Sequence, residues 1–444
     1  MKSSLTSRSL KLLGLATKVG RQELAQTIKG QFSKSLEELS TGRLNTRINQ
    51  ARLIAEHLSQ LKGAAMKAGQ MLSLDAADFF PPEAIELLSK LQGQATPVAW
   101  EIMRSVWLEE LGSEKIKEFT SLSETPAASA SIGQVHRGVL SEGHAIREVA
   151  VKIQYPGIAE SIDSDLSILQ AVAQSFVTLT GRKMDLNELF EELNVVLKQE
   201  ADYVRERENM LEFRTLLAND DNFIVPQPVT SLCSRRVLTM SWHNGVSINE
   251  WLKKSPPLVD RERIARQILD LYCREFYEWG LVQTDPNYAN FLIQENPLKL
   301  VLLDFGAVLR YTPDFRREYV EMLKILGTLD RQKIIRSFTD FGLLDYRESD
   351  EVKDDFVNFL LISLEPFLPA KQPFRFRNDD FGKRSRDFGR AFAQKLKYSA
   401  PPRKVIFLHR KLGGIFTLLK KMDIEISLLP YWEQMTRTVI VPKG

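Results

Sequence analysis

Apolar residues repeat at helical spacing through the first third of the chain. Leucine and alanine residues recur there three or four positions apart, at Leu58, Leu61, Ala65, Ala68 and Leu72. This spacing places the side chains on one face of a helix. Prolines at 81 and 82 interrupt the pattern and begin a second expected helix over 83–91. Residues 1–95 are therefore predicted to form a helical extension.

Strands are predicted in the next part of the chain. Residues 131–139 surround a turn of small side chains, and residues 148–153 are rich in valine and isoleucine. A third apolar run, 237–240, has the length of a buried strand. Helical periodicity fills the interval between these strands, over 163–178 and 185–216. We therefore expect a strand-containing domain with a helical insert over 96–245.

The remainder of the chain is predicted to be mainly helical. Two short apolar runs, 291–293 and 300–303, are the exception, and they predict a β-hairpin. A helix is expected soon afterwards, over 315–326. Strands embedded between helical regions predict an α+β fold whose last domain spans 246–444.

The composition is that of a globular protein, since 43% of the 444 residues are hydrophobic and 26% are charged. Two cysteines, Cys233 and Cys273, are too few for a disulfide framework or a cysteine-rich zinc site. The longest stretch without a charge, 166–181, is shorter than the ~20 apolar residues of a membrane-spanning helix. These features argue against the secreted disulfide-rich and transmembrane classes.

Basic residues are concentrated in two segments, although the net charge is only +3. Residues 1–22 hold five basic side chains and no acidic one, and residues 371–411 hold thirteen basic and three acidic ones. The second segment is interleaved with Phe374, Phe376, Phe381, Phe388 and Phe392. Such segments favour an anionic partner surface, either membrane or nucleic acid, and a solvated helix face is the alternative.

Three polar residues in the C-terminal half have the order and spacing of a phosphoryl-transfer site. An apolar run ends in Asp-Phe-Gly at Asp304, which by itself fits a strand-ending turn equally well. Upstream, Asp285 and Asn290 are five positions apart, as are the catalytic Asp and the metal-binding Asn of H-R-D-x-x-x-x-N. The pattern predicts that Asp285 is catalytic and that Asn290 and Asp304 bind a divalent metal.

A phosphate-binding loop and a lysine are predicted in the N-terminal half. Val149–Lys152 matches the V-A-I-K strand, whose lysine reaches the α- and β-phosphates of ATP. An alanine-rich version of G-x-G-x-x-G-x-V precedes it, and its expected ATP-binding residues are Ala128, Ser129, Ala130, Ser131, Gly133 and Val135. Because alanine restricts the backbone more than glycine does, we expect this loop to be stiffer than a glycine-rich loop.

Together these residues resemble the UbiB-type atypical kinases, the AarF-domain family that includes the mitochondrial coenzyme-Q kinases. The marks of the family are a K-x-G-Q signature at 67–70, the alanine-rich loop, an E-x-D signature at 200–202 and the run Gln283–Asn287. The resemblance implies a two-lobed, protein-kinase-like fold with an N-terminal helical extension and a mainly helical C-lobe. It also implies that ATP or ADP binds together with Mg²⁺.

The resemblance assigns further roles. It implies that Lys152 is catalytic and pairs with a helix glutamate, Glu206, and that the adenine meets the backbone near Met240. Two departures from the family pattern are Ser129, at a usual alanine, and Ser241, at a usual acidic residue. Ser129 is able to donate a hydrogen bond to a phosphate or to cap a turn.

A regulatory role is implied for the two signatures. Lys67 would lie in the nucleotide cleft near Glu200 and Asp202 and would block the place of a peptide substrate. The sequence pattern places Lys67 and Gln70 on one helix face, apart from the core stripe, where solvent exposure is the alternative. Within one continuous helix, Glu200 and Asp202 would point to different sides.

We rank three functions. The first is an ATPase or small-molecule kinase that acts in isoprenoid-quinone metabolism at a membrane. The second is a protein kinase, which is disfavoured because Pro313 and a new helix follow Asp304 closely and no A-P-E element is present. The third is a non-catalytic nucleotide-binding scaffold, which has no chemical need for Lys152, Asp285 and Asn290 together with Asp304.

Expected partners are a nucleotide, a membrane lipid or quinone precursor, and quinone-biosynthesis proteins. Nucleic acid is the weaker choice because the kinase motifs give the basic segments another explanation. We expect residues 1–22 to attach the protein peripherally to a membrane. The short N-terminal region favours the inner face of a bacterial membrane, and the mitochondrial matrix side is expected if the source is eukaryotic. The phosphate acceptor and the oligomeric state stay open.

Overall fold

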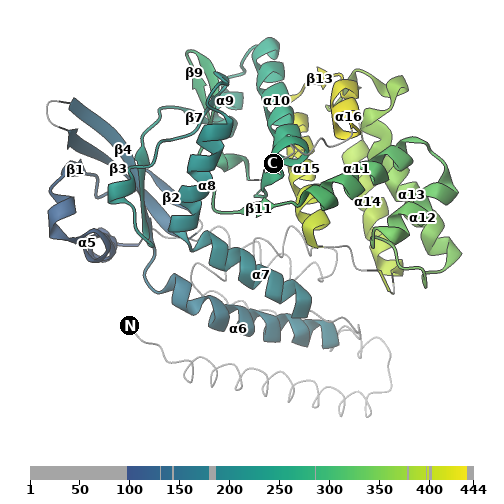
Figure 1. Cartoon of the computed structure of the whole chain (residues 1–444), viewed down its shortest axis with the longest axis horizontal. Coiled ribbons are helices and arrows are strands. Elements are labelled where there is room, and N and C mark those ends of the chain that lie inside the picture. Colours follow the sequence, from purple (N-terminus) through teal and green to yellow (C-terminus); the bar gives the residue numbers. More distant parts are fainter. Residues whose placement is uncertain are drawn as a thin grey trace, which may run out of the picture. The chain divides into compact units, whose positions relative to one another are not determined.

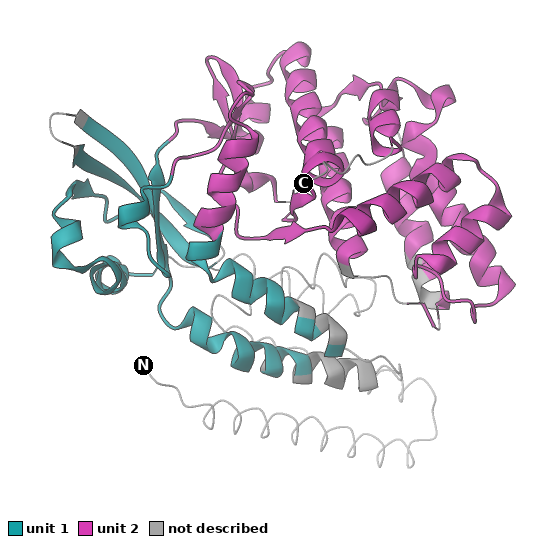
Figure 2. Cartoon of the chain, in the orientation of Figure 1, with its two compact units in different colours: residues 1–205, 228–242 teal, residues 206–227, 243–444 magenta. Residues whose placement is uncertain are grey.

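A computed structural model (Figure 1) describes residues 98–130, 132–142, 145–179, 187–285, 287–377, 380–396, 398–399 and 403–437. The chain divides into two compact units (Figure 2): unit 1 is Met1–Arg205 with Pro228–Trp242, and unit 2 is Glu206–Gln227 with His243–Gly444. The helices expected in the first 95 residues, with Lys67 and Gln70, lie outside the described residues. The three-domain division at 95 and 245 stays a prediction.

Unit 1 contains an antiparallel sheet with the strand order β1-β3-β4-β6, and β2 pairs with β3. Its strands are β1 (Phe119–Leu122), β2 (Ala128–Ala130), β3 (Gly133–Glu142), β4 (Ala145–Gln154) and β6 (Val237–Ser241). The apolar residues that predicted the second strand, Val149, Val151 and Ile153, are all buried. The three strands expected here are confirmed, with somewhat different ends.

In the part of unit 1 that the structure describes, the sheet is accompanied by helices α5 (Trp100–Ile116), α6 (Ile158–Leu179) and α7 (Asn187–Glu200). Helix α5 packs on the sheet through Trp107, whose ring meets Phe119 of β1 edge-on at 5.1 Å between centroids. Helices α6 and α7 lie side by side (Figure 1). The sequence pattern did not predict α5, because its buried residues are interspersed with charged ones.

The helix expected over 185–216 is broken at Ala201 and Asp202, so this part of the prediction is wrong. Helix α7 ends at Glu200, and α8 (Tyr203–Leu216) begins three residues later. The carboxylate oxygen Oδ1 of Asp202 accepts hydrogen bonds from the backbone N–H groups of Val204 and Arg205, each at 3.1 Å. An aspartate that accepts from the first free N–H groups is a helix N-cap, so Asp202 starts α8.

Unit 2 contains the predicted hairpin. Strands β9 (Phe291–Glu295) and β10 (Leu298–Leu302) pair antiparallel, with Leu302 opposite Phe291. Strand β5 (Phe223–Ile224) runs parallel to β10, and β7 (Val246–Ser247) joins the other side of β9. A second ladder pairs β8 (Leu281–Gln283) with β11 (Val308–Arg310).

Helices form most of unit 2, as the sequence predicts (Figure 1). Among the described residues they are most of α8, α9 (Ile248–Lys253), α10 (Leu258–Cys273), α11 (Pro313–Gly327), α12 (Arg331–Asp340), α13 (Asp350–Leu364), α14 (Phe381–Lys395), α15 (Arg403–Met422) and α16 (Leu429–Met435). Strands β12 (Phe374–Arg375) and β13 (Glu425–Ile426) pair near the C-terminal end. Among the helices that the structure describes, none is both long and apolar enough to cross a membrane.

A π-helical turn, Arg274–Trp279, continues α10 towards β8. It ends at Gly280, where φ is +68° and a Cβ atom would lie 2.7 Å from the carbonyl oxygen of Tyr311. The guanidinium of Arg316 on α11 donates to the carbonyl oxygens of Tyr277 and Glu278, each at 3.1 Å. The end of this turn therefore depends on two residues. Gly280 is not easily replaced by another residue, and the buried Arg316 satisfies the last carbonyl groups.

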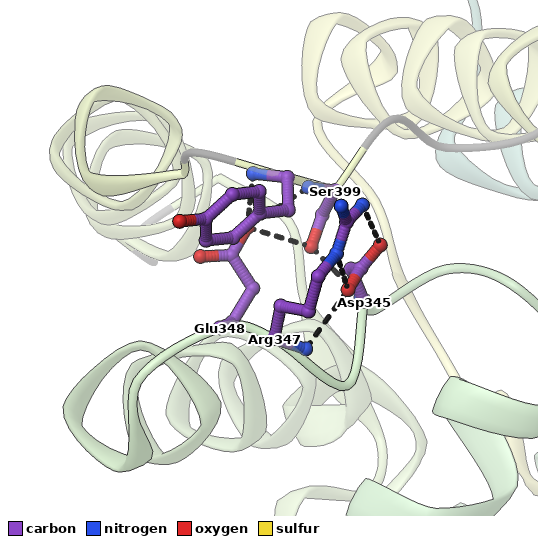
Figure 3. A network of polar contacts seen from close by, with 5 residues as sticks. Asp345, Arg347, Glu348 and Ser399 are labelled. Atoms are coloured by element: carbon purple, nitrogen blue, oxygen red, sulfur yellow. Dashed lines mark hydrogen bonds and ion pairs between the residues drawn. The ribbon is translucent and has the colours of Figure 1, made fainter.

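A polar network joins the loop between α12 and α13 to the segment between α14 and α15 (Figure 3). The carboxylate of Glu348 accepts from the backbone N–H groups of Tyr398 and Ser399, at 2.8 and 2.9 Å. The hydroxyl oxygen of Ser399 accepts from the backbone N–H of Asp345, and the side chain of Arg347 pairs with that aspartate. These hydrogen bonds between the two segments fix the chain just before α15.

A buried ion pair connects α15 with the π-helical turn. The carboxylate of Glu275, 1% exposed, meets the ammonium of Lys411, 5% exposed. Burial raises the pKa of Glu275 and lowers the pKa of Lys411, while the attraction between the two charges opposes both shifts. Glu275 also accepts from the backbone of Gln283 in β8. The pair therefore ties three elements together near the end of β8.

We predict that Lys411→Met makes the stability of the protein depend on pH. Without the lysine, Glu275 binds a proton in the folded state, whereas in the unfolded chain it is ionised above a pKa near 4.5. The folded state then holds more protons than the unfolded state, so stability falls as pH rises, by up to about 1.4 kcal/mol per pH unit. Urea unfolding at pH 8 should show a loss of about 3–5 kcal/mol, and a smaller loss at pH 5.5.

The double variant Glu275→Gln/Lys411→Met is the matched control, because it removes both charges. Its stability should lack the steep fall with rising pH that Lys411→Met shows. If Lys411→Met stays within about 1 kcal/mol of wild type at pH 8, the ion pair does not carry this role.

Candidate functional site

Asp285 lies directly after β8, in a segment held by hydrogen bonds on both sides. The backbone N–H and hydroxyl of Thr284 both donate to the carbonyl oxygen of Ala307, at 2.8 and 3.0 Å. The side-chain amide of Asn290 donates to Oδ2 of Asp285 at 3.0 Å, and the backbone N–H of Asn287 donates to Oδ1 at 3.2 Å. The carboxylate is thus oriented through both of its oxygens.

The Asp-Phe-Gly turn follows β10 and is held at three points. The backbone N–H of Gly306 donates to Oδ1 of Asp304 at 2.9 Å, and the backbone N–H of Leu303 donates to the carbonyl oxygen of Asn290 at 2.9 Å. Phe305 is buried, and its carbonyl oxygen accepts from the amide of Asn209 at 2.9 Å. These contacts bring Asp285, Asn290 and Asp304 together within unit 2, as their spacing predicted.

Asn209 was missed by the sequence analysis. It lies on α8, is buried, and connects that helix to the Asp-Phe-Gly turn across 96 positions of sequence. The nearby sequence offers one indication of this role: Asn209 lies three residues after Glu206, which places both side chains on the same face of the helix.

The residues present fit a magnesium ion. Asn290 donates its amide N–H to Asp285, which leaves its carbonyl oxygen as the candidate ligand, and Asp304 supplies a carboxylate. Both line a small pocket in unit 2, together with Phe213, Leu271, Glu275, Gln283, Phe291, Leu302 and Phe305. The described residues contain no cluster of three or more His, Cys, Asp or Glu side chains able to hold a metal. Two oxygen ligands completed by phosphate and water are the arrangement that Mg²⁺ prefers.

The alanine-rich segment of unit 1 forms a hairpin with β3. Ala128 lies opposite Val135, Ser129 opposite Gln134, and Ala130 opposite Gly133; Ser131, between the strands, lies outside the described residues. At Gly133 a Cβ atom would lie only 2.4 Å from the carbonyl oxygen of Ile153. Backbone pairing and this close approach explain why the segment keeps its glycine and is able to use alanine elsewhere.

Lys152 lies on β4 between two neighbouring strands, opposite Val135 of β3 and Leu238 of β6. It is 8% exposed, and its ammonium lies 4.9 Å from the centroid of the Tyr203 ring. Met240 is buried on β6, opposite Ala150. The lysine, the alanine hairpin and Met240 thus belong to one sheet in unit 1.

The remaining predicted residues lie around the break between α7 and α8. Glu200 is the last residue of α7 and is buried, Asp202 caps α8, and Glu206 is fully buried in α8. Because the chain is not helical at Ala201 and Asp202, the argument that Glu200 and Asp202 face opposite sides of a helix does not apply. The pairing of Lys152 with Glu206 and the regulatory role of the E-x-D signature stay predictions.

Carboxylates from outside the basic segment 371–411 compensate much of its charge. The ion pairs are Lys371–Glu365, Arg375–Glu425, Arg377–Asp423, Arg384–Glu365, Lys395–Glu351, Lys395–Asp355 and Lys411–Glu275. Three of the five interleaved phenylalanines, Phe374, Phe376 and Phe392, are buried in the core. This segment is therefore a weaker candidate for a membrane contact than its composition indicated.

Comparison with known proteins identifies the family of the chain. Residues 90–338 match the family model of the ABC1 atypical kinase-like domain. The chain is 34% identical over 427 residues to a rat protein, atypical kinase COQ8B, mitochondrial, covering 96% of this chain and 79% of that one. It is 34% identical over 385 residues to atypical kinase COQ8, mitochondrial, of Saccharomyces cerevisiae, covering 86% and 75%.

A solved structure confirms the expected fold class. The Mycobacterium tuberculosis protein Rv3197, in a complex with erythromycin, matches with a TM-score of 0.61 and 26% identity, over 92% of this chain and all of that chain. The kinase-like α+β fold that the motifs predicted is therefore present. Since the family model spans more than half of the chain and relatives match over most of its length, the protein belongs to the ABC1, or UbiB-type, family of atypical kinases.

Proposed function

We propose that the protein is an atypical kinase or ATPase that uses Mg-ATP in isoprenoid-quinone metabolism at a membrane. The observation that carries this proposal is that Asn290 donates to Asp285 and lines one pocket with Asp304, in a chain of the ABC1 family. A carboxylate, an amide and a second carboxylate in this order are the catalytic and metal-binding groups of kinase chemistry. The names of the relatives, COQ8 and COQ8B, support the quinone pathway.

The proposal assigns a separate role to the candidate groups within each unit. Unit 1 supplies Lys152 for the α- and β-phosphates and the hairpin from Ala128 to Gly133 to cover the phosphate chain. Unit 2 supplies Asn290 and Asp304 to hold Mg²⁺, and Asp285 to orient or deprotonate the attacking water or alcohol. Bound Mg²⁺ supplies charge neutralisation at the phosphates. The protein contributes positioning and fixed charges, which carry most of such a reaction.

Transfer to a protein substrate is the less favoured alternative. After the Asp-Phe-Gly turn the chain forms β11, which pairs with β8, and α11 begins at Pro313. An ordinary protein kinase places a long activation segment here to seat a peptide. The seven positions from Gly306 to Thr312 do not leave room for one, so water or a small lipid-like alcohol is the better acceptor.

The rat and yeast relatives are named as mitochondrial proteins, and this supports a place beside a membrane that contains quinones. Peripheral attachment through residues 1–22 is the route we propose, because that segment carries five basic residues and no acidic one. The inner face of a bacterial membrane and the matrix side of a mitochondrial one are the two corresponding locations.

The first test is Asp304→Asn. Removing the carboxylate charge should lower Mg-dependent ATP turnover by about a hundredfold or more, because the amide is a poor ligand for a hard cation. Turnover is measured as phosphate release at a series of magnesium concentrations. Asp350→Asn, on the exposed first turn of α13, is the matched control and should be active. Wild-type hydrolysis by Asp304→Asn, with normal thermal unfolding, would refute the metal assignment.

The second test concerns the alanine hairpin. Ala128→Gly should make β2 less rigid, because ordering glycine in a strand costs up to about 1 kcal/mol more backbone entropy than ordering alanine. The ratio of ATP affinity to ADP affinity should then change by about fivefold. Affinities are measured by calorimetric titration with each nucleotide. Ala218→Gly, in an exposed turn after α8, serves as the control. An unchanged ratio would mean that the alanines serve only the sheet.

The third test concerns the membrane. The full chain should co-sediment with vesicles that contain 30–40% anionic lipid at low salt, and binding should weaken at high salt, because each basic residue near such a surface contributes about 1 kcal/mol. Deletion of residues 1–22 should weaken binding more than tenfold. Neutral vesicles are the control. Binding of the deletion variant at the wild-type level would exclude this segment as the attachment site.

A further inference from the structure

Two side chains of strand β4 contact the turn between α7 and α8. The amide nitrogen of Gln154 donates to the carbonyl oxygen of Ala201 at 2.9 Å, and both groups are buried. Two positions earlier on the same strand, the ammonium of Lys152 lies 4.9 Å from the centre of the Tyr203 ring. Residues two apart on a strand share a face, so one face of β4 contacts Ala201 and Tyr203 together.

Tyr203 also reaches the alanine-rich hairpin. Its side chain is 0% exposed, and a Cβ atom built on Gly133 would lie 2.8 Å from its hydroxyl oxygen. The ring therefore contacts Lys152 while its hydroxyl end contacts the backbone at the start of β3. One buried side chain meets both the lysine and the glycine of the nucleotide-binding pattern.

An aromatic ring is a suitable neighbour for this ammonium. Burial of a lysine is costly unless its charge is compensated, and Lys152 is 8% exposed. The electron-rich face of a tyrosine attracts a cation within about 6 Å, and this attraction strengthens when water is excluded. The ring also restricts where the long lysine side chain is able to lie, which preorganises the ammonium for a phosphate.

We propose that Tyr203 is a positioning residue for nucleotide binding: its ring holds the ammonium of Lys152 in place, and its hydroxyl end sets the spacing between that ammonium and Gly133. The proposal rests on the function proposed above, in which Lys152 contacts the phosphates. The turn that carries the E-x-D signature thereby contacts the lysine through the residue that follows it.

The electrostatic part of this role is separable from packing. Tyr203→Phe keeps the ring and removes the hydroxyl, and pentafluorophenylalanine placed at position 203 keeps the shape but withdraws electron density from the ring face. Phe190→Leu, a buried ring on α7 of the same unit, is the control for general loss of core packing.

ATP and ADP affinities are measured by calorimetric titration of the full chain, and kcat and KM by phosphate release. Relative to Tyr203→Phe, pentafluorophenylalanine should weaken nucleotide binding about tenfold and raise KM by a similar factor, the size expected for loss of a desolvated cation–π contact. Thermal unfolding of the two proteins should be nearly the same. Phe190→Leu should lower thermal stability and leave the affinity of the folded protein within twofold of wild type.

A second readout follows Lys152 without nucleotide. The rate at which a neutral acylating reagent modifies Lys152, read by peptide mass spectrometry, should rise severalfold with pentafluorophenylalanine and stay unchanged in Phe190→Leu. Equal labelling and equal affinity for the Phe and pentafluorophenylalanine proteins would overturn the proposal. If Lys152→Met binds nucleotide like wild type, the proposed function fails instead, and the labelling rates still decide whether Tyr203 holds the lysine.

Discussion

The register of the β9–β10 hairpin is the constraint on which the candidate site depends. Asn290 and Asp304 are fourteen positions apart, and they meet because Leu302 pairs with Phe291 and the backbone of Leu303 donates to Asn290. A slip of one residue would turn alternate side chains to the other face and separate the two candidate ligands. Asp285 depends on the same hairpin, since the amide that orients its carboxylate belongs to Asn290.

Support for this hairpin comes from buried polar groups rather than from apolar packing alone. Asn209 holds the carbonyl of Phe305, and Glu275 holds the backbone of Gln283 while pairing with Lys411. A buried polar group is stable only when its partners are in place, so each contact favours one arrangement of the loops over others. The geometry of the candidate site is thus maintained by buried polar groups that surround Asp285, Asn290 and Asp304.

The sequence predicted the parts of the site that depend on short spacing. Asp285 and Asn290 are five positions apart, and the hairpin was visible as two apolar runs. What it did not predict depends on distant partners: Asn209 contacts a residue 96 positions away, and Lys411 contacts one 136 positions away. The break at Asp202 was missed because helical periodicity continues through the cap on both sides. The burial of Phe374, Phe376 and Phe392 was missed because basic residues alternate with them and pair elsewhere.

The turn between α7 and α8 combines two roles that sequence signatures alone do not separate. Asp202 caps α8 with its carboxylate, and the next residue, Tyr203, contacts Lys152. If a ligand displaced this turn, the protein would lose the N-cap of α8, which is worth about 1 kcal/mol. It would also lose the contact between Lys152 and the Tyr203 ring, which is worth up to about 2 kcal/mol. Coupling energies between allosteric sites are commonly about 1–3 kcal/mol. With the role proposed for Tyr203, regulation through the E-x-D signature would need no large rearrangement, because a small shift of this turn would move the ring that contacts Lys152.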